Sequence, residues 1–230
     1  MSMNDIQTFL SEQTPLIKNN CTILSAEDLG SNLMYHIGTT KMNNDPYVPR
    51  IGDRQADSED RTVPRVTVST CLLGCLYGYA TAVISALKNE ISGFYIHKLP
   101  FEHCLKPTKK LVSDRDVSDE HWLVRYNKDT TTYQGFFIGR LVIESILTKP
   151  RIEGKFTVTD LTVLIEVTED VPLTKETVLK EGCYRLLINY GVDKVSSTLN
   201  ALPVSKGEFN KVKNQTVGTS LEKISPTFKW

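Results

Sequence analysis

Tyr35-His36-Ile37-Gly38-Thr39-Thr40 is the most informative stretch of the chain, because it predicts a short strand that carries a histidine into a turn. About thirty residues later, the β-branched run Arg65-Val66-Thr67-Val68-Ser69-Thr70 predicts a second strand, which leads directly into an apolar helix that carries tyrosines. A histidine at a strand edge, followed by small hydroxylated residues, can hold a ribose, and a tyrosine can stack on a flat ring. Together the two stretches suggest a nucleotide pocket.

The rest of the chain predicts an α+β fold with a mixed or antiparallel sheet and a central buried helix, because its strand-forming runs cluster rather than alternate with long helices. The predicted strands are 33–37, 63–69, 93–98, 121–126, 136–143, 155–158, 162–167 and 183–189, and the predicted helices are 4–13, the central 72–87 and a short one at 172–180. The long stretch from Thr39 to Pro64 lacks hydrophobic periodicity, and a loop of this length is usually functional.

The chain divides into three predicted segments. Residues 1–30 form a peripheral N-terminal extension with a helix, residues 31–200 form the core domain, and residues 201–230 form a polar tail. We expect the tail to be partly extended or to wrap the core domain through Phe209, Leu221 and Trp230. With 230 residues, the chain is long enough to bury a self-sufficient core.

Composition excludes several classes of protein. Lysine plus arginine equals aspartate plus glutamate at 27 each, so no overall field draws the chain to nucleic acid or to an anionic membrane, although a local patch remains open. No apolar run approaches the roughly 20 residues that span a bilayer, which argues against a membrane partner. The five cysteines form no disulfide framework and the amino terminus has no signal-peptide pattern, so we expect a cytoplasmic protein. The spacing of Cys71, Cys75, His103 and Cys104 matches no usual zinc motif, so no metal site is predicted.

Two titratable residues are the strongest site candidates. Strand alternation puts Met34 and His36 on one face, so His36 is either a histidine satisfied by a carbonyl or a donor to a ribose hydroxyl, assisted by Gly38 and Thr39. Glu120 stands directly before a predicted strand, where a carboxylate can stabilise positive charge on an anomeric carbon. The alternative is that Glu120 is a solvated charge that belongs to the acidic run before the strand.

These residues resemble the motifs of the ADP-ribosyltransferase superfamily, including the poly(ADP-ribose) polymerase branch. In that family a first-strand histidine stands in a Tyr/His-His-Gly-Ser/Thr context, a tyrosine follows a second strand and short helix, and a glutamate opens a later strand. Tyr35-His36-Ile37-Gly38-Thr39 is similar to the first motif, with one additional residue before the glycine. Val66 to Ser69, followed by Tyr77 and Tyr79, is similar to the second, and Glu120-His121-Trp122-Leu123-Val124 to the third.

The resemblance implies an ADP-ribosyltransferase-like fold with NAD as substrate and a protein or nucleic acid as acceptor. Glu120 and His36 would be catalytic, with Glu120 stabilising the oxocarbenium-like state as nicotinamide leaves. The residues implied in holding NAD are His36, Gly38, Thr39, Ser69 and one of Tyr77 and Tyr79, with Arg50, Arg54 and Arg65 as candidates for the diphosphate. For each arginine the alternative is an ion pair with Asp53, Asp57, Glu59 or Asp60.

The chain also resembles small proteins of bacteria and bacteriophages, through Pro49-Arg50, Glu59-Asp60, Pro64-Arg65 and Gly74-Cys75. Three classes of function therefore stay open: an ADP-ribosyltransferase, a non-catalytic nucleotide-binding module, and a protein-interaction factor such as a phage inhibitor of a host or defence enzyme. His36, a tyrosine of the helix and Glu120 in one cleft would favour the first two classes. Their dispersal would favour the third.

Overall fold

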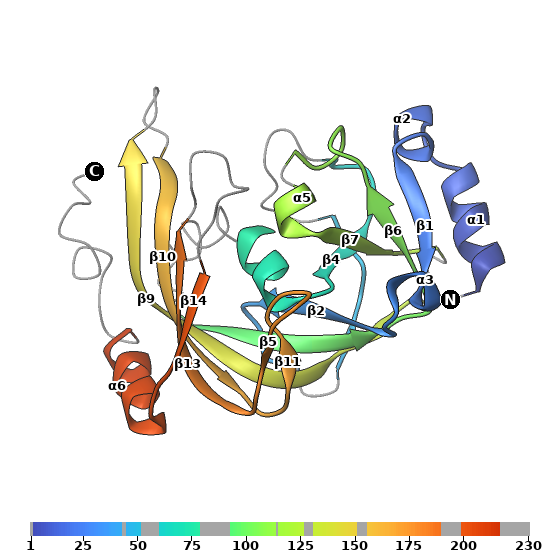
Figure 1. Cartoon of the computed structure of the whole chain (residues 1–230). Coiled ribbons are helices and arrows are strands. Elements are labelled where there is room, and N and C mark those ends of the chain that lie inside the picture. The colour runs from blue at the N-terminus through green and yellow to red at the C-terminus, as the bar shows by residue number, and fades with distance from the viewer. Residues whose placement is uncertain are drawn as a thin grey trace.

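The structure, a computed structural model, describes residues 2–42, 45–51, 60–78, 93–113, 115–126, 131–150, 156–189 and 199–216. Within these residues, ten strands form one bent sheet (Figure 1). In the order in which they lie side by side, they are β1 (Cys21–Ser25), β6 (His103–Pro107), β7 (Glu120–Val124), β4 (Arg65–Ser69), β2 (Leu33–Gly38), β5 (Gly93–Pro100), β9 (Phe136–Pro150), β10 (Phe156–Val167), β13 (Gly182–Asn189) and β14 (Leu199–Pro203). The registered pairings are all antiparallel, which decides between the mixed and antiparallel sheets that the sequence left open.

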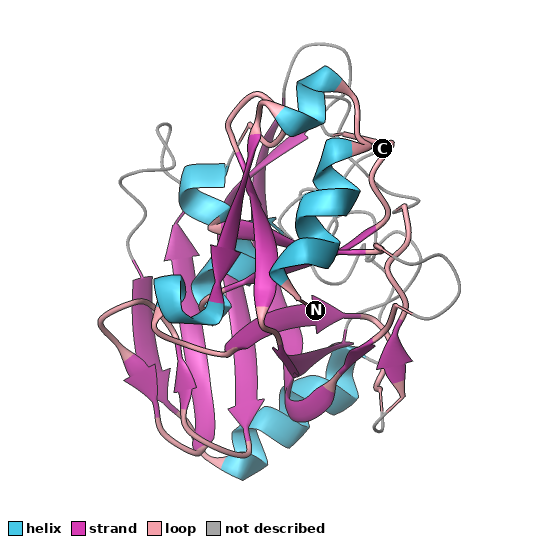
Figure 2. Cartoon of the chain, turned by 90° about the vertical axis from the view of Figure 1, so that its right-hand side faces the viewer, coloured by secondary structure: helices cyan, strands magenta, loops and turns pink. Residues whose placement is uncertain are grey.

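Short elements surround the sheet, and Figure 2 distinguishes the helices from the strands. Two further two-stranded sheets pair β3 (Pro46–Tyr47) with β8 (Tyr133–Gln134) and β11 (Val171–Pro172) with β12 (Val178–Leu179). The helices with described ends are α1 (Met3–Ser11), α2 (Pro15–Lys18), α3 (Ala26–Leu29), α5 (Arg115–Ser118) and α6 (Lys206–Thr216), and residues 72–78 are also helical. No helix in this described part is both long and apolar enough to cross a bilayer.

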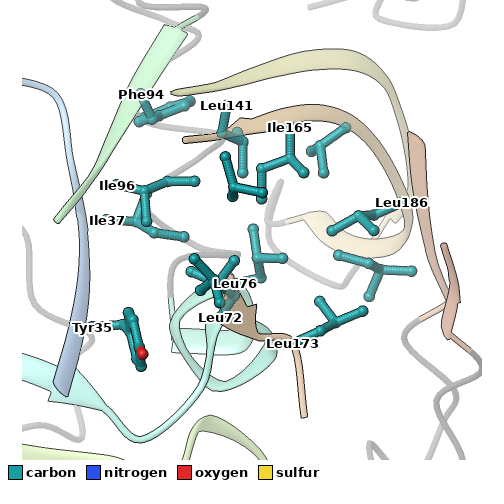
Figure 3. Close-up of a cluster of buried hydrophobic side chains, with 14 of the residues drawn as sticks. Tyr35, Ile37, Leu72, Leu76, Phe94, Ile96, Leu141, Ile165, Leu173 and Leu186 are labelled. Atoms are coloured by element: carbon teal, nitrogen blue, oxygen red, sulfur yellow. The ribbon is translucent and has the colours of Figure 1, made fainter. Parts of the chain in front are cut away.

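The largest hydrophobic core lies between the sheet and helix 72–78 (Figure 3). Leu72, Leu76 and Tyr77 of the helix pack there against Tyr35 and Ile37 of β2. Strands β5, β9, β10 and β13 contribute further members, including Phe94, Ile96, Leu141, Ile165 and Leu186. Burial of an apolar side chain of this size stabilises the fold by about 1.5–3 kcal/mol. The rest of the helix predicted over 72–87 lies outside the described residues.

The N-terminal elements cover a second core at the other end of the sheet. A capping box between Ser2 and Asp5 starts α1, which buries Ile6 and Phe9. These residues pack in a cluster with Trp122 of β7. The predicted peripheral segment 1–30 thus also contains β1, an edge strand of the sheet.

The helix predicted at 172–180 is wrong, because this segment forms a turn between β11 and β12. Thr174 lies near the start of this turn. Its hydroxyl does accept hydrogen bonds from the amides of Glu176 and Thr177, at 3.1 and 3.0 Å, but the Leu173 amide then donates to the Thr177 carbonyl and closes a tight turn. A threonine hydroxyl that accepts hydrogen bonds from the amides two and three residues later stabilises a turn as well as the start of a helix.

The C-terminal segment is more ordered than a polar tail. Residues 199–203 add β14 to the edge of the sheet, and α6 packs its fully buried Phe209 on Val142 and Leu164. Arg185 joins this region by ion pairs to Glu144 and Glu208, each 2.7 Å long. The predicted Phe209 anchor is therefore present, and Leu221 and Trp230 lie outside the described residues.

Candidate functional site

The edge of β4 that faces β2 is only partly paired with it. Ser69 is registered opposite Tyr35, the one such pair between β2 and β4 in the described chain. Four residues earlier, Arg65 exchanges two backbone hydrogen bonds with Arg50, at 3.0 and 3.3 Å. At this end of β4, the hydrogen-bonding partner is therefore Arg50, in the connection that follows β2, and not β2 itself. Between these two points, the carbonyl of Thr67 needs a different partner.

The side chain of His36 supplies that partner. Its Nδ1 lies 2.8 Å from the Thr67 carbonyl oxygen, and because a carbonyl only accepts, Nδ1–H is the donor. Burial lowers the pKa of His36 and the charge of Arg50 lowers it further, while the bond to Thr67 opposes both. The ring is therefore neutral at pH 7, and Nε2 is an acceptor. The sequence predicted that His36 either donates to a ribose hydroxyl or is satisfied by a carbonyl. In the structure a carbonyl satisfies its Nδ1–H, and its Nε2 is an acceptor.

Gly38 leaves the space next to this acceptor open. A Cβ on Gly38 would lie 3.2 Å from Nε2 of His36 and 3.8 Å from the hydroxyl of Tyr47. Tyr47, on β3, stands edge-to-face against the His36 ring with centroids 5.1 Å apart. Thr39 follows Gly38 in an exposed bend, and the Arg50 side chain is exposed as well. The His36 acceptor and the Tyr47 side chain thus lie together where β2 and β4 separate, and Thr39 and Arg50 are exposed residues of the connection that follows β2. We call this place the β2–β4 split.

His97 fixes the Tyr47 side chain from the neighbouring strand. It stands opposite His36 in the register of β2 and β5 and is fully buried. Its Nε2 accepts from the Met42 amide at 3.1 Å, so Nδ1–H donates to the Tyr47 hydroxyl at 2.9 Å. Burial lowers the pKa of His97 to about 4, with smaller contributions from the His36 and Lys41 charges. His97 is therefore neutral and holds the segment after β2 in place.

Glu120 lies on the other side of the sheet from His36. It stands opposite Ser69, which stands opposite Tyr35, so these three residues form one row across β7, β4 and β2. Because side chains alternate along a strand, His36 points away from this row. Glu120 is 6% exposed, and its carboxylate accepts from the Trp122 indole Nε1–H at 2.6 Å. His36 and Glu120 are therefore not in one cleft, contrary to what the resemblance implies.

The remaining predicted residues are also dispersed. Ser69 is buried beneath helix 72–78, and Tyr77 is buried in the core that contains Tyr35. Arg65 takes the alternative role: its guanidinium lies over the Trp122 ring at 4.2 Å, donates to two backbone carbonyls and pairs with Asp60 at 3.7 Å. Tyr79 and Arg54 lie outside the described residues. Of the predicted set, His36, Gly38, Thr39 and Arg50 remain at the split.

Sequence reasoning missed Tyr47 and His97 as members of this cluster. Tyr47 lies in the stretch without hydrophobic periodicity, so no pattern marks it. His97 alternates with buried neighbours in a predicted strand, and only the pairing of β5 with β2 shows that it faces His36. Among the described residues, no three His, Cys, Asp or Glu side chains are grouped closely enough to hold a metal ion.

Comparisons with protein-family models, with curated proteins and with solved structures gave no match. The function of the chain is therefore inferred from its own residues.

Proposed function

We propose that the chain binds a nucleotide of the NAD or ADP-ribose type at the β2–β4 split. The observation that carries this proposal is the fixed, neutral tautomer of His36, whose Nε2 acceptor stands beside Gly38. A ribose hydroxyl is a suitable donor to that nitrogen. The exposed Arg50 offers its guanidinium to a phosphate, and Thr39 offers a further hydroxyl.

The separation of His36 from Glu120 favours a function without catalysis, and by the expectation stated from the sequence it counts in favour of a protein-interaction factor. Two such alternatives came from the sequence, a nucleotide-binding module and a protein-interaction factor. The polar groups at the split support the nucleotide, because an imidazole acceptor, two hydroxyls and a guanidinium match a sugar phosphate better than an apolar protein surface. A protein partner becomes the better explanation only if no nucleotide binds.

Calorimetric titration of the purified chain with NAD and with ADP-ribose tests this proposal. We expect saturable heat, and an affinity about tenfold weaker in His36→Ala, the cost of one lost hydrogen bond to the ligand. Arg50→Ala should weaken the affinity for ADP-ribose by a similar factor. The matched controls are His103→Ala on β6 and Lys110→Ala on the turn that follows β6, which should bind as the wild type does. Absence of heat with both ligands, or equal losses in the controls, would reject the proposal.

ADP-ribosyl transfer is the second candidate, and one observation favours it. The three strands that carry the family-like motifs are neighbours in the sheet, in the order β7, β4 and β2, and Tyr35, Ser69 and Glu120 form one row across them. This reaction requires NAD to bind on the Glu120 side of the sheet and not at the β2–β4 split. The C–N bond between the ribose and nicotinamide then breaks, and Glu120 stabilises the positive charge left on the anomeric carbon until an acceptor attacks it. The acceptor would be a protein or a nucleic acid.

Release of nicotinamide distinguishes the two candidates. Transfer predicts release that is lost in Glu120→Gln while the calorimetric affinity for NAD is kept. Glu181→Gln, at an exposed surface position, is the control for a change of one carboxylate. NAD binding without release in the wild-type chain would exclude transfer and leave nucleotide binding in place.

A further inference from the structure

A group of aromatic and cationic side chains lies on the same side of the sheet as His36, over β5 and β9. Tyr95 stands opposite Arg140, and His97 stands opposite Phe137. The Phe137 ring centroid is 6.3 Å from that of Tyr95 and 6.1 Å from that of His97. Except for the buried His97, these residues are partly exposed.

Two cations border the same rings. Lys41 places its Nζ 4.6 Å from the centroid of the Phe137 ring, and Arg140 places its Cζ at 6.0 Å. A cation held only by an aromatic face is bound weakly enough to exchange it for another partner. We call Lys41, Tyr95, Phe137 and Arg140 the β5–β9 patch.

Two carboxylates of β10 and of the turn that follows it are paired with lysines outside the patch. Glu166 stands opposite Arg140 across β9 and β10, but its carboxylate pairs with Lys206 of α6. Glu169 pairs with Lys98 at 2.6 Å. Among the residues that the structure describes, neither Lys41 nor Arg140 has a carboxylate partner. The patch therefore carries positive charge that no described carboxylate compensates.

We propose that the β5–β9 patch binds single-stranded nucleic acid. Aromatic rings on an open sheet face stack unpaired bases, and cations beside them contact the phosphates. In this arrangement a base stacks on Phe137 in place of the Lys41 ammonium, which turns to the adjoining phosphate, and Arg140 contacts the next phosphate. A duplex is disfavoured because its bases are already stacked on one another. The patch does not rest on the mononucleotide proposal, since it uses none of the groups at His36.

Fluorescence anisotropy with a labelled oligothymidylate, and with the same strand in a duplex, tests this proposal. We expect the wild-type chain to bind the single strand and to bind the duplex at least about tenfold more weakly. Phe137→Ala should lose about tenfold in affinity through the lost stacking. The double variant Lys41→Glu with Arg140→Glu should also bind more weakly, and its slope of log affinity against log salt should be shallower by about 1.4, for two phosphate contacts.

The matched control is Lys110→Glu with Lys175→Glu, which changes the net charge by the same amount at two exposed positions elsewhere. It should bind the oligonucleotide as the wild type does. If Phe137→Ala does not fold, judged by circular dichroism, the surface charge variants carry the test. No binding by the wild type, equal affinity for the duplex, or equal losses in the control would overturn the proposal. His36→Ala should leave oligonucleotide binding unchanged, which separates this site from the β2–β4 split.

Discussion

The indole Nε1–H of Trp122 donates to the Glu120 carboxylate across 2.6 Å, and both side chains are buried on the same side of β7. A buried carboxylate that loses its donor retains the full cost of its desolvation. We therefore expect Trp122→Phe to lower the free energy of unfolding by about 1–3 kcal/mol beyond the loss of indole packing.

Urea unfolding of Trp122→Phe, Glu120→Gln and the double variant measures this coupling. The double variant should lose less than the sum of the single losses, with an interaction energy of about 0.5–3 kcal/mol. Strict additivity would show that the hydrogen bond contributes nothing to stability.

Gly74 and Gly78 form a matched pair on one helix. A Cβ on Gly74 would lie 2.6 Å from the Ser118 carbonyl oxygen and would overlap the Ser69 hydroxyl, whereas at Gly78 the nearest atom is 3.6 Å away. Gly74→Ala should therefore destabilise the chain by about 1–3 kcal/mol through overpacking. Gly78→Ala should be neutral or stabilising by up to about 1 kcal/mol, since alanine favours a helix. Thermal melts of the two variants decide the point, and equal shifts would contradict the close approach at Gly74.

Phe209 anchors α6 to the sheet. Its side chain is fully buried against Val142 and Leu164, so Phe209→Ala should cost about 3–5 kcal/mol. Hydrogen exchange should then accelerate in residues 206–216 more than in β2 or β5. Leu202→Ala, at a position 51% exposed, is the control and should change stability by less than about 0.5 kcal/mol. Unchanged exchange in α6 would mean that Phe209 does not hold it.

His97 makes stability depend on pH. Its pKa is lowered from 6.5 to about 4, so between these values the unfolded chain binds a proton that the folded chain does not. The contribution of neutral His97 is complete above pH 6.5 and is lost as the pH falls to about 4, for a total of about 3 kcal/mol. The pKa values of His36 and His121 are also lowered, mainly by burial, and they add in the same direction.

Unfolding titrations at several pH values check this sign. The wild-type free energy of unfolding should rise from pH 4 to 6.5, and His97→Gln should flatten part of that rise. A wild-type stability that is level over this interval would contradict a neutral, buried His97.

Local pattern predicted much of the sheet. β2, β4, β5, β7 and β13 lie in runs with β-branched and aromatic residues, and each was expected close to its observed place. β1 and β6 were missed because their sequences, Cys21-Thr22-Ile23-Leu24-Ser25 and His103-Cys104-Leu105-Lys106-Pro107, lack a run that is strong enough without the neighbouring strand. β1 pairs with β6 and β6 pairs in turn with β7, and this pairing stabilises both strands.

The candidate site was less predictable, because it depends on register. His36 could be singled out from the sequence, but its contact with Thr67 exists only where β2 departs from β4. The opposite orientation of Glu120 follows from the pairing of Tyr35 with Ser69, and a shift of one residue would have put His36 in the same row. The register between two strands is set by contacts between residues that are far apart in the sequence, so no local sequence pattern predicts it.

The lone Tyr35–Ser69 pair also has a consequence for what holds the two halves of the sheet together. Strands joined by a full ladder are held by a series of backbone hydrogen bonds, whereas β2 and β4 share one registered pair and the His36–Thr67 bond. Helix 72–78 lies at this junction, with the Cys75 thiol donating to the Tyr35 carbonyl at 3.2 Å. A buried cluster that contains Met34 of β2 and Val66 and Val68 of β4 spans it. Side-chain packing, more than a backbone ladder, therefore joins the two halves of the sheet.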